Sequence, residues 1–267
     1  FIFFNFKIFN KINVMITIIG GSGFVGSRLI SIIGKSNCVN LDKNKSPLFN
    51  SITKIGNILN IDDLNFQKET KAVVLLAAEH KDNVSPHSMY YDVNVRGTNN
   101  VLKKMDQFGI KNLIFTSSVA VYGLNKSNPD ESHDVDPFNH YGRSKLEAEN
   151  LVRHFGVSWA IVRTVLVYGF TPHLSRSNII LWVKENLEKQ TPIKVVTDQY
   201  RTPTLAEDLA EGCSLILNEK ASGLFHVSGD EMMTPFEMAQ QVADHFGLNQ
   251  ELIEPVTANT FTQPGKR

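Results

Sequence analysis

The 267-residue sequence has little cysteine, no excess of either charge and no long apolar run. Its two cysteines, Cys38 and Cys213, lie far apart and no Cys/His cluster occurs. This argues against a disulfide framework or a metal site and predicts a reducing, cytoplasmic environment. Basic and acidic residues number 27 each, so no overall field draws the chain to nucleic acid or anionic lipid. No stretch approaches the roughly 18–20 apolar residues of a membrane span. We therefore expect that the protein binds neither nucleic acid nor a membrane.

The first fourteen residues, FIFFNFKIFNKINV, differ from the rest of the chain. Five of the 17 phenylalanines fall within the first nine positions, and the small-residue cleavage site of a signal peptide is missing. We therefore expect 1–14 to be a non-native or disordered extension, with the natural start at Met15.

From Met15 onward, strand-like and helix-like apolar patterns alternate. This alternation predicts an α/β fold over 15–168, with a doubly wound parallel sheet and helices on both of its faces. The expected strands are 15–19, 38–41, 72–78, 112–118 and 159–165, and the expected helices are 24–34, 89–108 and 140–155.

Beyond about Gly169 the pattern becomes mainly helical, with expected helices at 176–189, 204–218 and 234–246. The last helix opens with a capping box formed by Thr234 and Glu237, with Pro235 at its first position. We assign 169–267 to a smaller α-rich, substrate-binding lobe that is interleaved with the first domain. The chain ends at QPGKR without a closing element, which suggests a truncated C-terminus.

Three glycines stand where the first strand should turn into the first helix, at Gly20, Gly23 and Gly26. A helix that begins directly after a strand aims its free backbone N–H groups above the sheet edge, where a pyrophosphate fits. One glycine permits the tight turn, one lets a ligand approach the backbone, and one lets the helix pack on the strand. Glycines also serve ordinary turns, so this loop is weak evidence by itself.

Asp42 ends the next expected strand, 22 residues after Gly20. An acid at this place accepts hydrogen bonds from an adenosine ribose and repels a 2′-phosphate. Asp42 therefore favours NAD over NADP, although Lys43 and Lys45 weaken that preference. The alternative is an ordinary acidic residue in the turn after a strand.

A second constellation joins Tyr141, Lys145 and the strand-end hydroxyls of Thr116, Ser117 and Ser118. Residues four apart share one face of a helix. A nearby ammonium would stabilise the tyrosine phenolate and lower the pKa of the tyrosine toward neutrality. A strand-end serine could then hold a carbonyl or an alcohol for proton transfer.

The sequence resembles the extended short-chain dehydrogenases/reductases, the NAD-dependent epimerase/dehydratase family, from about Met15 to Phe261. After the glycine loop, LLAAEH, DVNVRGTNNVL, FTSSVAVYG and YGRSKLEAE occur in the family's order. The resemblance implies a Rossmann-type fold and an enzyme that uses NAD, with NADP as an alternative. It also implies a nucleotide-sugar substrate and suggests a homodimer.

The same resemblance assigns the site residues. Ser118, Tyr141 and Lys145 correspond to the catalytic set, and Ser118, Asn178 and Arg201 to substrate contacts. Asn57 stands where the family usually has an aspartate that contacts adenine. The cofactor-binding positions are Gly20, Gly23, Phe24, Val25, Gly26, Asp42, Asn57, Ile58, Ala77, Ala78, Asn94 and Lys145.

The resemblance leaves the reaction open. Val119 and Ala120 replace the Asp-Glu pair of 4,6-dehydratases, which argues against a dehydratase. The segment around Ser118 resembles C4-epimerases, whereas 198–212 and 223–239 are similar to dTDP-4-dehydrorhamnose reductases. In both reactions Tyr141 would exchange a proton with the sugar C4 oxygen while the nicotinamide exchanges hydride with C4. A third reading is a non-catalytic dinucleotide-binding subunit, like the regulatory subunit of methionine adenosyltransferase.

Overall fold

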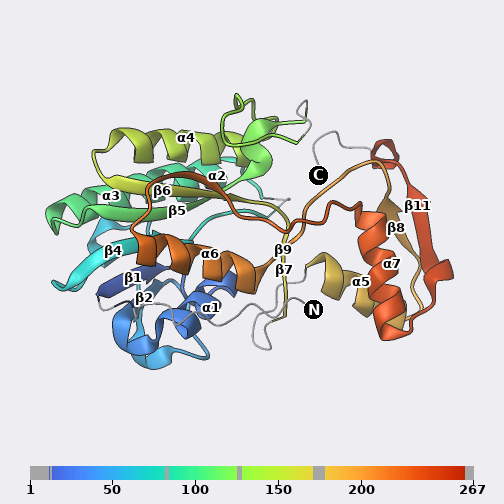
Figure 1. Ribbon diagram of the computed structural model, residues 1–267, viewed down its shortest axis with the longest axis horizontal. Helices are drawn as coiled ribbons and strands as arrows, with labels where there is room; N and C mark the ends of the chain where they lie inside the picture. Colours follow the sequence, from blue (N-terminus) through green and yellow to red (C-terminus); the bar gives the residue numbers. More distant parts are fainter. Residues whose placement is uncertain (1–11, 13, 82–83, 125–127, 171–177, 262–267) are drawn as a thin grey trace. The chain divides into compact units, whose positions relative to one another are not determined.

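The computed structural model describes residues 12, 14–81, 84–124, 128–170 and 178–261 (Figure 1). Residues 1–11 and 13, which make up nearly all of the expected N-terminal extension, lie outside that part of the chain. So does 262–267, which includes the QPGKR ending.

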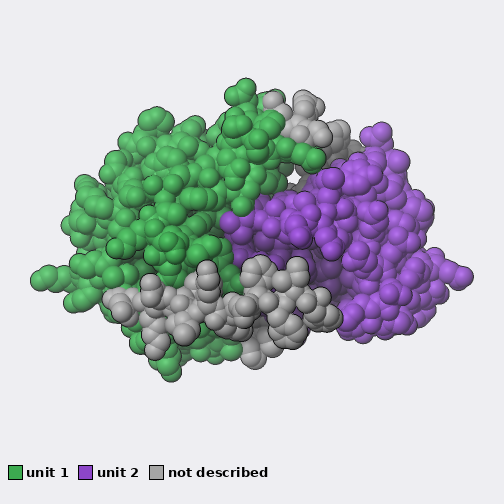
Figure 2. All heavy atoms as spheres, viewed as in Figure 1, with its two compact units in different colours: residues 1–163, 210–226 green, residues 164–209, 227–267 purple. Residues whose placement is uncertain are grey.

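The chain forms two compact units (Figure 2). The first unit comprises residues 1–163 and 210–226, and the second comprises 164–209 and 227–267. The chain therefore leaves the first unit and later returns to it. The expected domain limits at 168 and 169 stay a prediction.

Within the described residues, seven parallel strands form the sheet of the first unit, in the order β10-β6-β5-β4-β1-β2-β3. The first strand of the chain lies between β4 and β2, so the direction in which strands are added reverses beside β1. This is the doubly wound topology that the sequence predicts. The strands are β1 Met15–Ile19, β2 Cys38–Asp42, β3 Thr53–Ile55, β4 Thr70–Leu75, β5 Asn112–Ser118, β6 Ser158–Thr164 and β10 Gly223–His226.

Helices cover both faces of this sheet: α3 and α4 pack together on one face, and α1 lies on the other (Figure 1). Between the sheet and α3 and α4 lies the core of the unit, where Leu102, Phe115 and Ile161 are buried. The helices with residues in this unit are α1 Phe24–Ile33, α2 Ser88–Tyr91, α3 Thr98–Gln107, α4 His140–His154 and α6 Ala206–Glu219. Among the described residues, none of the helices is both long and apolar enough to cross a membrane.

The helix expected over 89–108 is interrupted. A π-helical segment, Asp92–Gly97, separates α2 from α3. Such segments are rare and often occur at functional sites, because the wider turn redirects side chains. Here it contains Asn94, one of the residues that the sequence assigns to the cofactor site.

The second unit contains α5 Ile179–Glu188, α7 Pro235–Phe246 and two parallel strand pairs. Strand β8 Ile193–Val196 pairs with β11 Ile253–Val256, and β7 Val167–Tyr168 pairs with β9 Thr204–Leu205. The expectation of an α-rich lobe therefore missed four short strands, which are too short to show a clear period. Helix α6 contributes to both units, since its residues from Ala210 onward belong to the first.

The capping box of α7 is confirmed. The Thr234 hydroxyl accepts the N–H of Glu237 at 3.1 Å, and the Glu237 carboxylate accepts the N–H of Thr234 at 2.6 Å. Because two N–H groups at the start of α7 are satisfied locally, the sequence alone predicts where this helix begins.

We expect Thr234→Ala to lower the free energy of unfolding by about 1 kcal/mol, because the first turn of α7 loses its cap. The measurement is urea denaturation followed by circular dichroism. Thr234→Ser keeps the hydroxyl and is the matched control. Equal stability of the alanine and serine variants would contradict the cap's role.

Candidate functional site

Most of the predicted cofactor residues follow the carboxyl ends of β1, β2, β3 and β4, and Asn94 and Lys145 lie on the helical segments after β4 and β5. In a doubly wound sheet, ligands bind at the carboxyl edge where the strand order reverses, here beside β1. The loops that leave β1 and β4 are in contact there, since the backbone N–H of Ala77 donates to the carbonyl of Ile19 at 3.0 Å.

The glycine loop performs two of the three tasks expected of it. Gly20 adopts a φ of +90°, and a Cβ there would lie 2.8 Å from the backbone nitrogen of Ala77. A Cβ on Gly26 would lie 2.5 Å from the Cα of Gly21, so α1 packs directly on the turn. Gly23 is the N-cap of α1, with no side-chain cap among the described residues. The first turn of α1, which contains Phe24 and Val25, carries no acidic residue.

Asp42 is held rigidly at the end of β2. One carboxylate oxygen accepts the N–H of Ser22 at 3.0 Å, and the other accepts the N–H of Asn44 at 2.9 Å. Asp42 is 9% exposed, whereas Lys43 and Lys45 are exposed. The carboxylate therefore has a fixed position directly beside the glycine loop.

Asn57 and Ile58 follow β3 and differ in their surroundings. Asn57 is exposed, and its side-chain oxygen accepts the N–H of Leu59 at 3.0 Å. Ile58 is buried, and a Cβ on Gly97 would lie 2.6 Å from it. The side chain of Ile58 thus belongs to the core, which leaves its backbone for any contact with a ligand. Contacts of both residues with a cofactor stay a prediction.

Asn94 fixes the segment that follows β4 and contains Ala77 and Ala78. Its side-chain oxygen accepts the N–H of Glu79 at 2.9 Å, and its nitrogen donates to the Glu79 carbonyl at 3.0 Å. The same nitrogen donates to the Ser144 hydroxyl of α4 at 2.9 Å. Asn94 is 1% exposed. It therefore acts as a buried tie between this loop and the helix that carries Tyr141 and Lys145.

The hydroxyls that end β5 have different partners. Thr116 donates to the Leu75 carbonyl of β4 at 3.1 Å. Ser118 is half-buried, and its hydroxyl oxygen accepts the N–H of Ala120 at 3.1 Å. Ser118 therefore begins the 3₁₀ turn Val119–Tyr122 while its hydroxyl proton stays available to a ligand.

The first turn of α4 approaches that 3₁₀ turn closely. Asn139 caps the helix by accepting the N–H of Gly142 at 2.8 Å. A Cβ on Gly142 would lie 2.5 Å from the Ala120 carbonyl oxygen, so a glycine is required there. Tyr141 precedes this glycine, so it lies on the helix turn that packs against the 3₁₀ turn after Ser118. The sequence analysis did not single out Gly142.

Lys145 is buried beneath the end of β5, with 2% of the residue exposed. Its Nζ donates to the Thr116 carbonyl at 2.6 Å and lies 4.2 Å from the centre of the Phe115 ring. Burial lowers the pKa of Lys145 to about 7, against an opposing effect of the Glu149 carboxylate. The lysine of the predicted Tyr-Lys pair is thus rigidly placed and titrates near neutrality.

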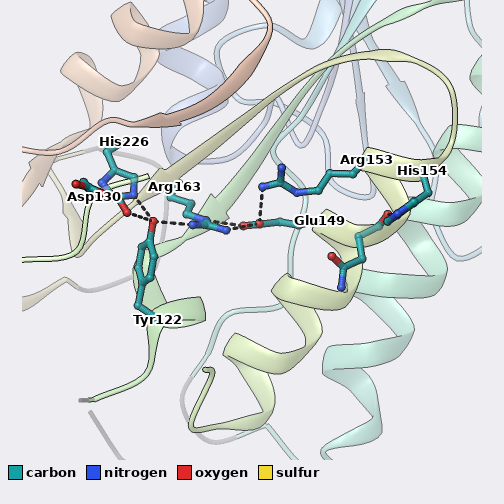
Figure 3. A network of polar contacts seen from close by, with 8 residues as sticks. Tyr122, Asp130, Glu149, Arg153, His154, Arg163 and His226 are labelled. Atoms are coloured by element: carbon teal, nitrogen blue, oxygen red, sulfur yellow. Dashed lines mark hydrogen bonds and ion pairs between the residues drawn. The ribbon is translucent and has the colours of Figure 1, made fainter. Parts of the chain in front are cut away.

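A buried polar network, which the sequence analysis missed, lies one turn further along α4 (Figure 3). Glu149 receives two bonds from Arg163 of β6, at 2.9 and 2.6 Å. Arg163 also donates to the Tyr122 hydroxyl at 2.6 Å, and that hydroxyl lies 2.7 Å from His226 of β10. Burial raises the pKa of Tyr122 and lowers that of His226. The one sequence signal is the spacing of Glu149, four residues after Lys145.

Two of the three predicted substrate residues, Asn178 and Arg201, lie in the second unit. Asn178 is the N-cap of α5: its oxygen accepts the N–H of Leu181 at 3.2 Å, and its nitrogen donates to the Gly169 carbonyl at 2.6 Å. Arg201 donates to the Tyr200 carbonyl at 2.7 Å and to the Gln199 side chain at 2.9 Å. Both side chains therefore have structural partners within that unit, and their contacts with a substrate stay a prediction.

Comparison with known protein families identifies the family of this chain. The model of the RmlD substrate binding domain family matches residues 14–267. The chain therefore belongs to this family. The membership agrees with the sequence resemblance to sugar-modifying short-chain dehydrogenases/reductases.

Two curated relatives cover different functions. The N-acetyl-alpha-D-glucosaminyl-diphospho-ditrans,octacis-undecaprenol 4-epimerase of Escherichia coli O157:H7 is 48% identical over 181 residues, which are 65% of this chain and 54% of the relative. Methionine adenosyltransferase 2 subunit beta of Bos taurus is 30% identical over 193 residues, 69% of this chain and 57% of the relative. The chain thus spans just over half the length of either relative.

Solved structures share the fold. A dTDP-4-dehydrorhamnose reductase from Clostridium acetobutylicum has a TM-score of 0.80 at 24% identity, covering 95% of this chain and 87% of that one. The UDP-glucose 4-epimerase of Thermus thermophilus, in complex with NAD, has a TM-score of 0.78 at 22% identity, with 91% and 86% covered. The predicted Rossmann-type fold is confirmed.

We expect Gly20→Ala to unfold at a lower urea concentration than Gly109→Ala. Both glycines have a positive φ, which costs an alanine of order 1–3 kcal/mol, but a Cβ on Gly109 meets nothing within 4 Å. The extra loss of stability in Gly20→Ala, relative to Gly109→Ala, therefore measures the effect of the close approach between Gly20 and Ala77. Equal midpoints for the two variants would show that the β1 and β4 loops do not constrain each other.

Proposed function

We propose that the chain carries the machinery of an NAD-dependent 4-epimerase that acts on a sugar joined through a diphosphate to its carrier. The observation that carries this proposal is Lys145, buried on the Thr116 carbonyl four residues after Tyr141. A buried ammonium is costly and is rarely kept without a role. The 48% identity to a 4-epimerase supports the choice of reaction.

The residues at the sheet edge fit a dinucleotide. The glycine loop packs its backbone closely at Gly20 and Gly26, α1 offers its N-terminus free of acidic residues, and Asp42 is fixed beside it. When bound, NAD would supply a nicotinamide that takes a hydride from sugar C4 and returns it. The residues proposed to hold it are Gly20, Gly23, Phe24, Val25, Gly26, Asp42, Asn57, Ile58, Ala77, Ala78, Asn94 and Lys145.

Tyr141 would act as acid and base on the C4 oxygen of the sugar. Its hydroxyl proton must leave near neutral pH, and the Lys145 ammonium favours the phenolate. Ser118 would hold the same oxygen through its hydroxyl proton. Val119 and Ala120 follow without a carboxylate, so these positions offer no acid for the elimination of water.

The fixed carboxylate of Asp42 favours NAD over NADP. Its two oxygens each have a lone pair left after the bonds from Ser22 and Asn44, which suits the two hydroxyls of a ribose. The negative charge of the Asp42 carboxylate would repel the 2′-phosphate of NADP. NADP remains the alternative because Lys43 and Lys45 are exposed nearby.

The diphosphate is the part of the substrate that a nucleotide sugar shares with a polyprenyl-linked sugar. The 48%-identical relative is named for an undecaprenol-linked diphosphate, whereas the structurally similar epimerase is named for a UDP sugar. Asn178 and Arg201 are the residues we propose near the diphosphate. We also retain a homodimer and a cytoplasmic location as proposals; free, buried Cys38 and Cys213 are consistent with the latter.

The test begins with the nucleotide that purifies with the protein. Denatured protein should release stoichiometric NAD, since an epimerase recycles its cofactor. The protein should then interconvert the C4 epimers of UDP-N-acetylglucosamine or of its polyprenyl-diphosphate counterpart. Oxidation of NADH or NADPH by a 4-keto nucleotide sugar would instead establish a reductase. If neither cofactor is released or binds on titration, the proposal fails.

A non-catalytic subunit is the second candidate, because the chain is 30% identical to methionine adenosyltransferase 2 subunit beta over 193 residues. Tyr141→Phe separates the two functions. We expect the variant to lose about 10²–10⁴-fold in kcat, because the proton of the C4 hydroxyl has no acceptor, while NAD binding by calorimetry is unchanged. Unaltered turnover would contradict the role of Tyr141.

A further inference from the structure

Lys145 needs an opposite charge that its immediate partners do not supply. Its Nζ donates to a carbonyl and lies over an aromatic ring, both of which are uncharged. Glu149 lies one helical turn further along α4, on the same face, and is 0% exposed. We propose that Glu149 is a positioning residue that acts through Lys145: its carboxylate, fixed by Arg163, keeps the Lys145 side chain charged at the end of β5.

Glu149 is held so firmly that it keeps its place without touching the ligand. Arg163 binds it with two parallel bonds from the neighbouring strand, at 2.9 and 2.6 Å, and Arg153 approaches it at 3.5 Å. A bidentate pair fixes direction as well as distance. Burial opposes the guanidinium charge, but the bonds that Arg163 donates to Glu149 raise the pKa of Arg163 overall.

Tyr122 anchors Arg163 in turn (Figure 3). Its hydroxyl accepts from Arg163 at 2.6 Å and donates to the Asp130 carbonyl at 2.8 Å. Because the single hydroxyl proton is thereby used, the Nε2 of His226, 2.7 Å away, must donate. The network thus ties Glu149 to the turn that starts at Ser118, so one set of bonds aligns both ends of the proposed catalytic set.

Among the other charged groups on the elements packed against α4, Lys103 and Asp106 of α3 are exposed. Asp92 and Arg96 of the π-helical segment form an exposed pair at 3.4 Å, and Lys104 of α3 lies over the Phe108 ring. On α4 itself, Tyr141 precedes Lys145 by one turn. Glu149 is the carboxylate whose charge raises the pKa of Lys145 against burial.

The inference rests on the proposed function, because the charge of Lys145 affects the proton transfer by favouring the Tyr141 phenolate. Loss of the Glu149 charge would let Lys145 deprotonate at lower pH. At a pH between the Lys145 pKa of the variant and that of the wild type, Tyr141 of the variant would then lack the Lys145 cation. A residue with only a structural role would lower activity by the same factor at every pH.

The experiment follows the Nζ of Lys145 by NMR in full-length, ¹⁵N-lysine-labelled protein between pH 5 and 10, with Lys145→Met to assign the signal. We expect Glu149→Gln to lower the midpoint by about one pH unit, a tenfold change in the proton dissociation constant. Glu147→Gln, on the exposed face of the same helix, should leave it unchanged. An unchanged midpoint in Glu149→Gln overturns the proposal.

Two further measurements keep the test decisive. If Glu149→Gln does not fold because Arg163 is left unpaired, Glu149→Gln with Arg163→Met removes both charges, which buried pairs often tolerate. The midpoint should still fall, but by less than in the single variant, because the repelling Arg163 charge is removed as well. In the epimerase assay, the loss of kcat/KM in Glu149→Gln should grow with pH. The NMR midpoint needs no substrate, so a wrong reaction assignment and a wrong role for Glu149 give different results.

Discussion

The structure depends most on a buried lysine that must stay in place beneath the edge of a sheet. Lys145 has a long, flexible side chain and a charge that burial disfavours, so its surroundings must fix both. The Thr116 carbonyl and the Phe115 ring hold the ammonium, while Gly142 brings the helix close enough to reach them. The position of Lys145 thus depends on how the first turns of α4 pack against the end of β5.

Three sets of contacts secure that helix from different directions. Asn94 ties it to the loop after β4, the close approach of Gly142 ties it to the turn after β5, and Glu149 ties it to β6 through Arg163. Buried polar groups of this kind gain little net stability over apolar packing, since desolvation offsets much of the attraction. Their value lies in geometry: each contact permits one position of the helix and excludes its neighbours.

The cofactor side of the site is built on a different principle. Its loops are fixed by the absence of side chains at Gly20 and Gly26 and by the two bonds that hold Asp42. A loop fixed in this way suits the proposed dinucleotide, because order that exists before binding reduces the entropy cost of binding. The proposed epimerase chemistry follows this division: the sheet edge would hold the NAD, and α4 would supply the group that exchanges a proton with the sugar.

The sequence by itself determined the features that arise from local spacing. Periodicity predicted the major strands and helices, the cap at Thr234 marked the start of α7, and the four-residue interval set Tyr141 and Lys145 on one helix face. The tertiary structure alone decided the two-residue strands, the π-helical turn around Asn94, and the bonds that join Glu149 to Tyr122 and His226. Those partners are far apart in the chain, and only the packing of neighbouring strands brings them within hydrogen-bond distance.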